Sequence, residues 1–141
     1  GGKTDIVMML NGALAGLVAI TAEPLTPGPI TAMFIGSIGA IIMYFGTKML
    51  ESYGLDDVVG AIPVHMFAGI FGTLVVPLTN PDTSFGTQFI GTASVCIFSF
   101  GLSWATFTIL KSTVGLRISK AAEKLGTDKA EVGVTAYSIR D

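Results

Sequence analysis

Acidic and basic residues are absent from four long stretches of the sequence. Residues 6–22, 24–47, 58–81 and 83–110 contain no Asp, Glu, Lys or Arg. Only 13% of the whole sequence is charged, which is about half the share in a typical soluble domain. Each stretch is close to or longer than the ~20 residues that cross a bilayer as a helix. The sequence therefore predicts an all-α protein, a polytopic bundle of four transmembrane helices followed by a tail.

Other features are scarce as well, and each absence excludes a class of protein. The single cysteine, Cys96, excludes an intrachain disulfide. The sequence contains no cluster of metal ligands, no glycine-rich phosphate loop and no Ser-His-Asp arrangement that its spacing supports. It also lacks a basic stripe of the kind that binds nucleic acid. We therefore expect no enzymatic activity, no cofactor and no nucleic-acid partner.

The basic residues that are present lie in only three places. Lys3 precedes the first stretch, Lys48 follows the second, and all the others follow the fourth. The connections at 23–29 and 79–84 contain no Lys or Arg. A chain that crosses four times has its start, its middle loop and its tail on one side, and the positive-inside rule makes that side cytoplasmic. This predicts an integral protein of the cell membrane whose start and tail are cytoplasmic.

Two carboxylates, Asp56 and Asp57, directly precede the third stretch. Carboxylates at such a position accept hydrogen bonds from the free amides of a helix start and complement its dipole. Helix capping is the interpretation that this position favours, and contact with a substrate is the alternative. Pro63 follows within the stretch, and it predicts a bend or a loosened backbone bond near His65.

Small residues recur four positions apart within the stretches. The pairs are Gly12 with Gly16, Gly36 with Ala40, and Gly69 with Thr73, and Gly72 lies close to the last pair. Such faces let helices approach closely in a bilayer. The glycines together predict a tight bundle, in which each single glycine serves plain helix packing. We also expect Asn11 and Thr21 to form hydrogen bonds between helices.

His65 is the only histidine, and it lies in the middle of the third stretch. An ionisable group inside a membrane span is costly unless it has a partner or lines a polar path, so it marks a functional site by default. The interpretation that we favour is a pore-lining imidazole that provides a polar contact for a small solute. The alternative is an imidazole that bonds a neighbouring helix and only fixes the packing.

The composition changes after Leu116. Residues 117–141 mix Lys, Glu, Asp and Ser with small residues, so we divide the chain into a transmembrane bundle at 1–116 and a cytoplasmic tail or linker at 117–141. Ser119 predicts the start of a short helix, and Gly126 predicts its end. The tail is either a docking surface or linker, or a solvated and partly disordered end.

Several of these residues form a series that resembles one known family. Along the chain, the motifs are NGALAGLVAIT at 11–21, Asp56-Asp57 with Asp57 eight residues before His65, then Gly69 and Gly72, then TVGLR at 113–117. Their order and spacing resemble the last third of the ammonium transporter family (Amt/Mep/Rh), over nearly the whole chain through Tyr137. Members of that family have eleven spans, so the resemblance implies that this chain supplies the eighth to the eleventh.

The resemblance implies a site and a mechanism as well as a fold. Family members are homotrimers, and each subunit has its own narrow, hydrophobic pore in which two histidines share a hydrogen bond. His65 matches the second of these histidines, and Ala61 matches an apolar pore-lining position one helical turn earlier. Ammonium is captured at an outer vestibule and deprotonated, and ammonia and a proton then cross. A dry pore disfavours a bare cation, while neutral imidazoles offer ammonia both a donor and an acceptor.

Parts of that pore lie outside these residues. In the family the first histidine, the aromatic gate and the outer recruitment site lie on earlier spans, so we expect a fragment, or one piece of a cleaved or split subunit, that needs the remaining spans as partners. The sequence also departs from the family pattern. Met66 follows His65 where the family usually has Gly, and the stretch from Glu131 to Tyr137 differs from the usual Glu-His-Gly. A PII-type regulator, which the resemblance implies as a partner, would therefore meet an altered tail.

Three functions remain open from the sequence. The first is part of an ammonium or ammonia transport channel of the inner or plasma membrane. The second is an ammonium-sensing membrane domain coupled to a signalling module, since some relatives have that arrangement and the altered tail suits a linker. The third is a purely structural bundle. A kinase or cyclase domain beyond Asp141 would favour the sensor, and methylammonium uptake by the complete protein would exclude the structural bundle.

Overall fold

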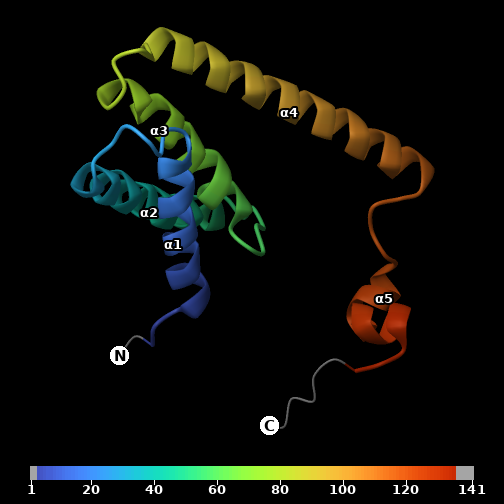
Figure 1. The fold of residues 1–141 in the computed structure, drawn as a ribbon. Helices are drawn as coiled ribbons and strands as arrows, with labels where there is room; N and C mark the ends of the chain where they lie inside the picture. The colour runs from blue at the N-terminus through green and yellow to red at the C-terminus, as the bar shows by residue number, and fades with distance from the viewer. Residues whose placement is uncertain (1–2, 136–141) are drawn as a thin grey trace. The chain divides into compact units, whose positions relative to one another are not determined.

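The computed structural model describes residues 3–135, and every regular element in that range is a helix (Figure 1). The elements are α1 (Ile6–Thr21), α2 (Pro29–Ser52), the π-helix η1 (Ile62–Phe67), α3 (Ala68–Val75), the 3-10 helix η2 (Val76–Leu78), α4 (Phe85–Thr113), α5 (Lys120–Leu125) and the π-helix η3 (Asp128–Val132). The prediction of an all-α protein is confirmed. Each apolar stretch corresponds to one helix or, for the third, to the continuous run η1–α3–η2.

Length separates the apolar helices into two pairs. α2 has 24 residues and α4 has 29, and both are long and apolar enough to cross a membrane. α1 has 16 residues, and the run Ile62–Leu78 belongs to the same shorter class. About 17 residues is the lower limit for a helix that spans a bilayer. The two shorter helices therefore lie near that limit.

Short-range signals determine where the helices begin. Asp5 caps α1, because its carboxylate accepts a hydrogen bond from the amide of Met8 at 3.0 Å. Pro29 is the first residue of α2, where its missing N–H removes no helical hydrogen bond. At the start of α4, the hydroxyl of Ser84 accepts from the amide of Thr87 at 3.2 Å. The starts at Pro29 and Ser84 end the connections at 23–29 and 79–84 that the sequence predicted.

α1, α2 and the η1–α3 segment pack against one another around a small core (Figure 1). Ala15 of α1, Met43 of α2, Val64 of η1 and Ala68 of α3 are each at most 1% exposed. Two of these four residues are alanines, so the helix axes approach closely. In a bilayer, where no hydrophobic force drives helices together, such close packing is what stabilises their association.

Several glycines lie where these helices approach closely. A Cβ atom at Gly16 would lie 3.1 Å from the carbonyl oxygen of Gly36, and one at Gly39 would lie 2.9 Å from that of Ala15. A Cβ atom at Gly72 would collide with the backbone of Ala19. Gly16, Gly36 and Gly72, which the sequence predicts as packing positions, therefore lie where α1 contacts α2 and α3. Gly39 is a further close approach, which was not predicted.

α4 differs from the other apolar helices because it contains no buried residue. Phe98, Phe100 and Trp104 are 68%, 75% and 66% exposed. Apart from the neighbouring backbone of α4 itself, no described atom lies within 4 Å of a Cβ atom placed at Gly91 or Gly101. A helix that is apolar on every side suits an environment of lipid or of other membrane helices.

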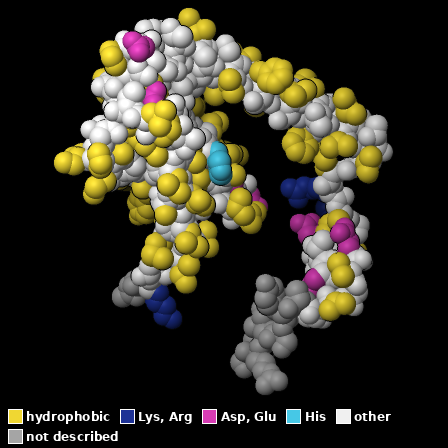
Figure 2. All heavy atoms as spheres, viewed as in Figure 1, with side chains coloured by type: hydrophobic (Ala, Val, Ile, Leu, Met, Phe, Trp, Pro, Cys, Tyr) yellow, Lys and Arg dark blue, Asp and Glu magenta, His cyan; other side chains and the backbone are white. Residues whose placement is uncertain are grey.

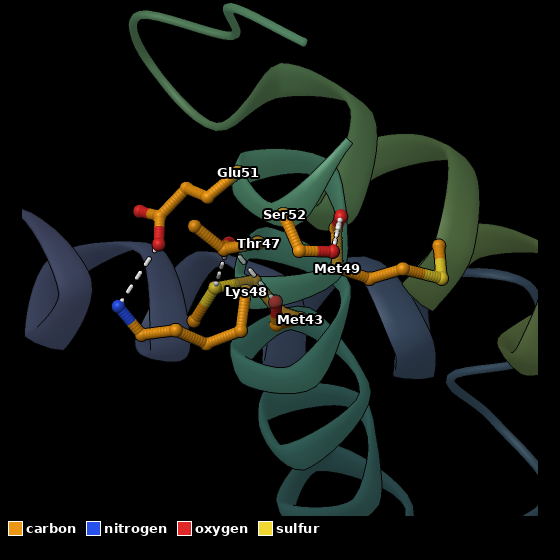
Figure 3. Close-up of polar contacts among 6 residues, drawn as sticks. All are labelled: Met43, Thr47, Lys48, Met49, Glu51 and Ser52. Atoms are coloured by element: carbon orange, nitrogen blue, oxygen red, sulfur yellow. Dashed lines mark hydrogen bonds and ion pairs between the residues drawn. The ribbon is translucent and has the colours of Figure 1, made fainter. Parts of the chain in front are cut away.

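Polar side chains near the end of α2 are satisfied locally (Figure 3). The hydroxyl of Thr47 donates to the carbonyl of Met43 at 3.0 Å, and Ser52 makes a similar bond at 2.7 Å within the same helix. Lys48 pairs with Glu51 at 3.0 Å, and both side chains are more than half exposed. Hydroxyl groups that bond their own helix need no interhelical partner inside an apolar span.

The chain divides into two compact units, Gly1–Ile97 and Phe98–Asp141. In the second unit, the hydroxyl of Ser119 caps α5 by accepting from the amide of Ala122 at 3.2 Å, and Gly126 ends the helix with φ +97°. The short helix that the sequence predicts here is confirmed. The division at 116 and 117 between bundle and tail stays a prediction, and Tyr137 lies outside the described residues.

Candidate functional site

His65 lies in η1, at the surface of the three packed helical segments (Figure 2). Pro63 in the same turn has no amide hydrogen, and the amide of Ala68 bonds to the carbonyls of both Pro63 and His65. A π-helical turn is wider than an α-helical one, and such turns occur frequently at functional sites. The departure from regular helix that Pro63 predicts is therefore present, next to the imidazole.

One nitrogen of the His65 ring is engaged by the backbone. Nδ1 lies 3.1 Å from the carbonyl oxygen of Ala61. Because a carbonyl oxygen only accepts, Nδ1 is the donor in this bond and carries the proton. In a neutral imidazole this leaves Nε2 to accept a hydrogen bond from another group.

Asp57 and Ala61 precede His65 in the sequence, by eight and four positions. Asp57 Oδ1 accepts from the amide of Ala61 at 2.9 Å, and Oδ2 accepts from the amide of Ile62 at 2.8 Å. A carboxylate at a helix start satisfies amides that have no helical partner. Ala61 is thus held on both sides, through its amide by Asp57 and through its carbonyl by His65. Asp56 is exposed, and within residues 3–135 its side chain makes no such bond.

α1 reaches this turn through Asn11. Its Nδ2 donates to the carbonyl of Val59 at 3.0 Å, across 48 positions of sequence. The next residue, Gly60, has φ +72°, and a Cβ atom there would lie 2.5 Å from Asn11 Nδ2. Both the left-handed backbone and the space that Asn11 occupies therefore require glycine at this position.

The expected interhelical bonds of Asn11 and Thr21 have different outcomes. Asn11 does bond outside its own helix, to the connection that precedes η1. Thr21 instead donates to the carbonyl of Leu17 in the same helix at 2.6 Å, so the prediction for Thr21 is wrong. The reason is that a threonine hydroxyl on a helix can reach the carbonyl four residues earlier. Gly60 was not predicted, although a glycine shortly before a helix that contains proline is a turn signal.

The two connections that lack Lys and Arg are joined by a hydrogen bond. Asn80 Nδ2, in the connection after η2, donates to Glu23 Oε2, in the connection after α1, at 2.9 Å. This bond and a second one from the amide of Leu25 lower the pKa of Glu23 from its ordinary value, so the side chain is an anion at neutral pH. The bond links one connection directly to the other, although the two residues are 57 positions apart in sequence. Both connections therefore lie at the same end of the packed helices.

The surroundings of the imidazole are apolar. Ile62 and Met66, which flank it in η1, are 39% and 46% exposed. His65 therefore presents an exposed polar ring with exposed apolar side chains on either side of it in η1. Such a surface can offer one donor or one acceptor to a small polar solute, or to a polar side chain of another span.

Comparison with known proteins gives a consistent result. A family model described as the Ammonium Transporter Family matches residues 1–137. The ammonium transporter Amt2 of Archaeoglobus fulgidus is 39% identical to the chain, over 96% of the chain and 33% of that protein. An ammonium transporter of Corynebacterium glutamicum is 32% identical, over 98% of the chain and 34% of that protein. The chain thus spans about a third of the length of these relatives.

Proposed function

Since the chain belongs to the ammonium transporter family, we propose that it forms part of an ammonium or ammonia channel of the cell membrane, with His65 and Ala61 on the substrate pathway. The observation that carries the proposal is the exposed imidazole between apolar side chains, with Nδ1 bonded to Ala61 and Nε2 left to accept. The relatives named as ammonium transporters support the choice of substrate.

In this proposal the imidazole provides the polar contact of a largely dry path. Nε2 of His65 accepts a hydrogen bond from the solute or from a histidine of another span, and the methyl group of Ala61 keeps the wall apolar. A path without water disfavours a bare cation, because burying an unpaired charge is costly. The reaction is transport rather than catalysis, and it needs no cofactor.

The partners in this proposal are the remaining spans of the same subunit, the lipid bilayer and two further copies in a homotrimer. The exposed aromatic side chains of α4 and its open glycines support further helix or lipid contacts. We also propose that the segment after Leu116 is a cytoplasmic tail, because it carries polar helices after the last apolar one. A PII-type regulator, if it binds there, would meet a tail that departs from the family pattern at 131–137.

The proposed orientation predicts a labelling pattern. Residues 1–116 cross the membrane four times, with both connections that lack Lys and Arg outside, as their Glu23–Asn80 bond supports. In a Cys96→Ser background, Thr26→Cys and Thr83→Cys should react with an impermeant reagent in intact cells, whereas Ser119→Cys should react only after lysis. Labelling at position 119 in intact cells would overturn the orientation.

The proposed transport predicts a difference between the complete subunit and this part of it. A complete subunit that contains these residues should take up methylammonium, and ammonium should inhibit the uptake. The 141 residues alone should insert into liposomes without conducting, because their contact faces and His65 lack partners. Absence of uptake by a folded complete subunit contradicts the function, and ammonium-specific flux through the 141 residues contradicts their being only part of a pore.

A further inference from the structure

We propose that Asn11 is a positioning residue for the His65 imidazole, an inference that rests on the proposed role of His65 in transport. Asn11 lies on α1, far from His65 in sequence, and touches neither the ring nor its carbonyl partner in the bonds of the described structure. It acts through the turn that precedes η1, at residues 57–61. The relevant bonds form a continuous series from α1 to the ring.

The series begins with the side-chain amide of Asn11, which donates to the Val59 carbonyl at 3.0 Å. This bond ties the turn before η1 to the well-packed helix α1, which contributes Ala15 to the core. The amide also occupies the space beside Gly60, where a Cβ atom would lie 2.5 Å away. Gly60 has φ +72° and is the most permissive residue of the turn. Asn11 therefore holds the turn at its most permissive residue.

The series continues from the turn to the ring. The amide of Gly60 bonds to the carbonyl of Asp57 at 3.1 Å, and the Asp57 carboxylate holds the amide of Ala61 at 2.9 Å. The carbonyl of Ala61 then accepts from Nδ1 of His65 at 3.1 Å. The Asp57 bonds are local to the turn and would move with it. The Asn11 bond is the one bond of this series that reaches α1, and it adds to the packing of Val64 and Ala68 against Ala15 in fixing the turn relative to α1.

Loss of the Asn11 donor has a specific consequence for the ring. When the Ala61 carbonyl is held in place, Nδ1 carries the proton and Nε2 is the acceptor. When the turn moves, the carbonyl no longer selects this tautomer, and both tautomers exchange. A functional group that is misplaced by ~1 Å can lose about 100-fold in rate, so we expect flux to fall by roughly tenfold or more.

The chain offers a matched control at the other end of the same helices. Asn80 also donates from Nδ2 to a distant residue, Glu23, at 2.9 Å. Asn80→Leu therefore removes one side-chain hydrogen bond between segments, as Asn11→Leu does, together with the bond that Asn80 Oδ1 accepts from the amide of Asp82 at 3.0 Å. Both of these bonds lie in the connections after α1 and η2 and not in the turn before His65. A purely structural role for Asn11 predicts that the two variants behave alike.

The experiment uses the complete subunit and measures two quantities in each variant. The first is methylammonium flux per folded trimer, with trimer recovery determined separately. The second is the tautomer of His65 from its ring ¹⁵N resonances, which are assigned by their loss in His65→Ala. We expect Asn11→Leu to give exchanging tautomers and a roughly tenfold lower flux, and Asn80→Leu to keep the unmodified tautomer and flux. Asn11→Ser, which is too short to reach Val59, serves if Asn11→Leu does not assemble.

The outcomes separate this inference from the proposed function. Unchanged ring resonances and flux in Asn11→Leu or Asn11→Ser overturn the positioning role. The same changes in Asn80→Leu as in Asn11→Leu also overturn it, because the effect would then be general. If His65→Ala retains full flux, the proposed function of His65 is wrong, while the ring resonances of Asn11→Leu still report whether Asn11 positions the ring.

Discussion

Replacing His65 with alanine in the complete subunit should lower ammonium flux per folded trimer and alter selectivity among small amines. The change removes the polar contact of the proposed path and leaves the group that bonds Nε2 without a partner. A buried group left unsatisfied costs ~1–3 kcal/mol, which corresponds to roughly 5- to 150-fold in an equilibrium or rate. The measurement is methylammonium uptake in proteoliposomes, divided by the amount of folded trimer.

His65→Glu provides the matched variant for this prediction. It keeps a group that accepts a proton, so we expect it to retain part of the flux with changed selectivity. A packing role for His65 predicts a different pattern, in which both variants fold poorly and the trimers that do form conduct normally. Flux and selectivity per trimer that are unchanged in His65→Ala would show that His65 only packs.

Replacing Gly72 with alanine should strongly destabilise the packing of α3 on α1. The added Cβ atom would collide with the backbone of Ala19, and a backbone cannot move aside as a flexible side chain can. Overpacking of this kind costs ~1–3 kcal/mol. We expect less folded trimer and a lower unfolding temperature in detergent, measured in the complete subunit.

Gly69→Ala is the control for Gly72→Ala on the same helix. A Cβ atom at Gly69 meets only Val18 Cγ1, at the ordinary contact distance of 3.6 Å. Alanine is also more favourable than glycine inside a helix, by roughly 0.5–1 kcal/mol, so this variant should be close to neutral or slightly more stable. Equal stability of the two variants would contradict the close approach of α1 and α3.

Features that depend on neighbouring residues could be predicted from the sequence. The uncharged stretches predict the apolar helices, because composition and length decide whether a segment suits a bilayer. Ser119 and Gly126 predict α5, because a cap and a glycine with positive φ act within one helical turn. Asp57 stands where a helix start needs acceptors, and its carboxylate bonds two amides there.

Features that depend on distant residues could not be predicted. The partner of Asn11 lies 48 positions along the chain and the partner of Glu23 lies 57 positions along it, so no local pattern identifies either. Thr21 shows the same limit, since a threonine that bonds its own helix looks identical in sequence to one that bonds a neighbour. Pro63 signals a departure from regular helix, but a bend and a π-helical turn have the same sequence signal.

The most direct test of the account is the position of His65 in an experimental structure of the complete subunit, determined at a resolution that shows its ring. We expect the imidazole to face an enclosed path, with Nδ1 on the Ala61 carbonyl and Nε2 within hydrogen-bonding distance of a histidine from another span or of the solute. An imidazole that faces lipid, or that packs between helices away from any path, would contradict it.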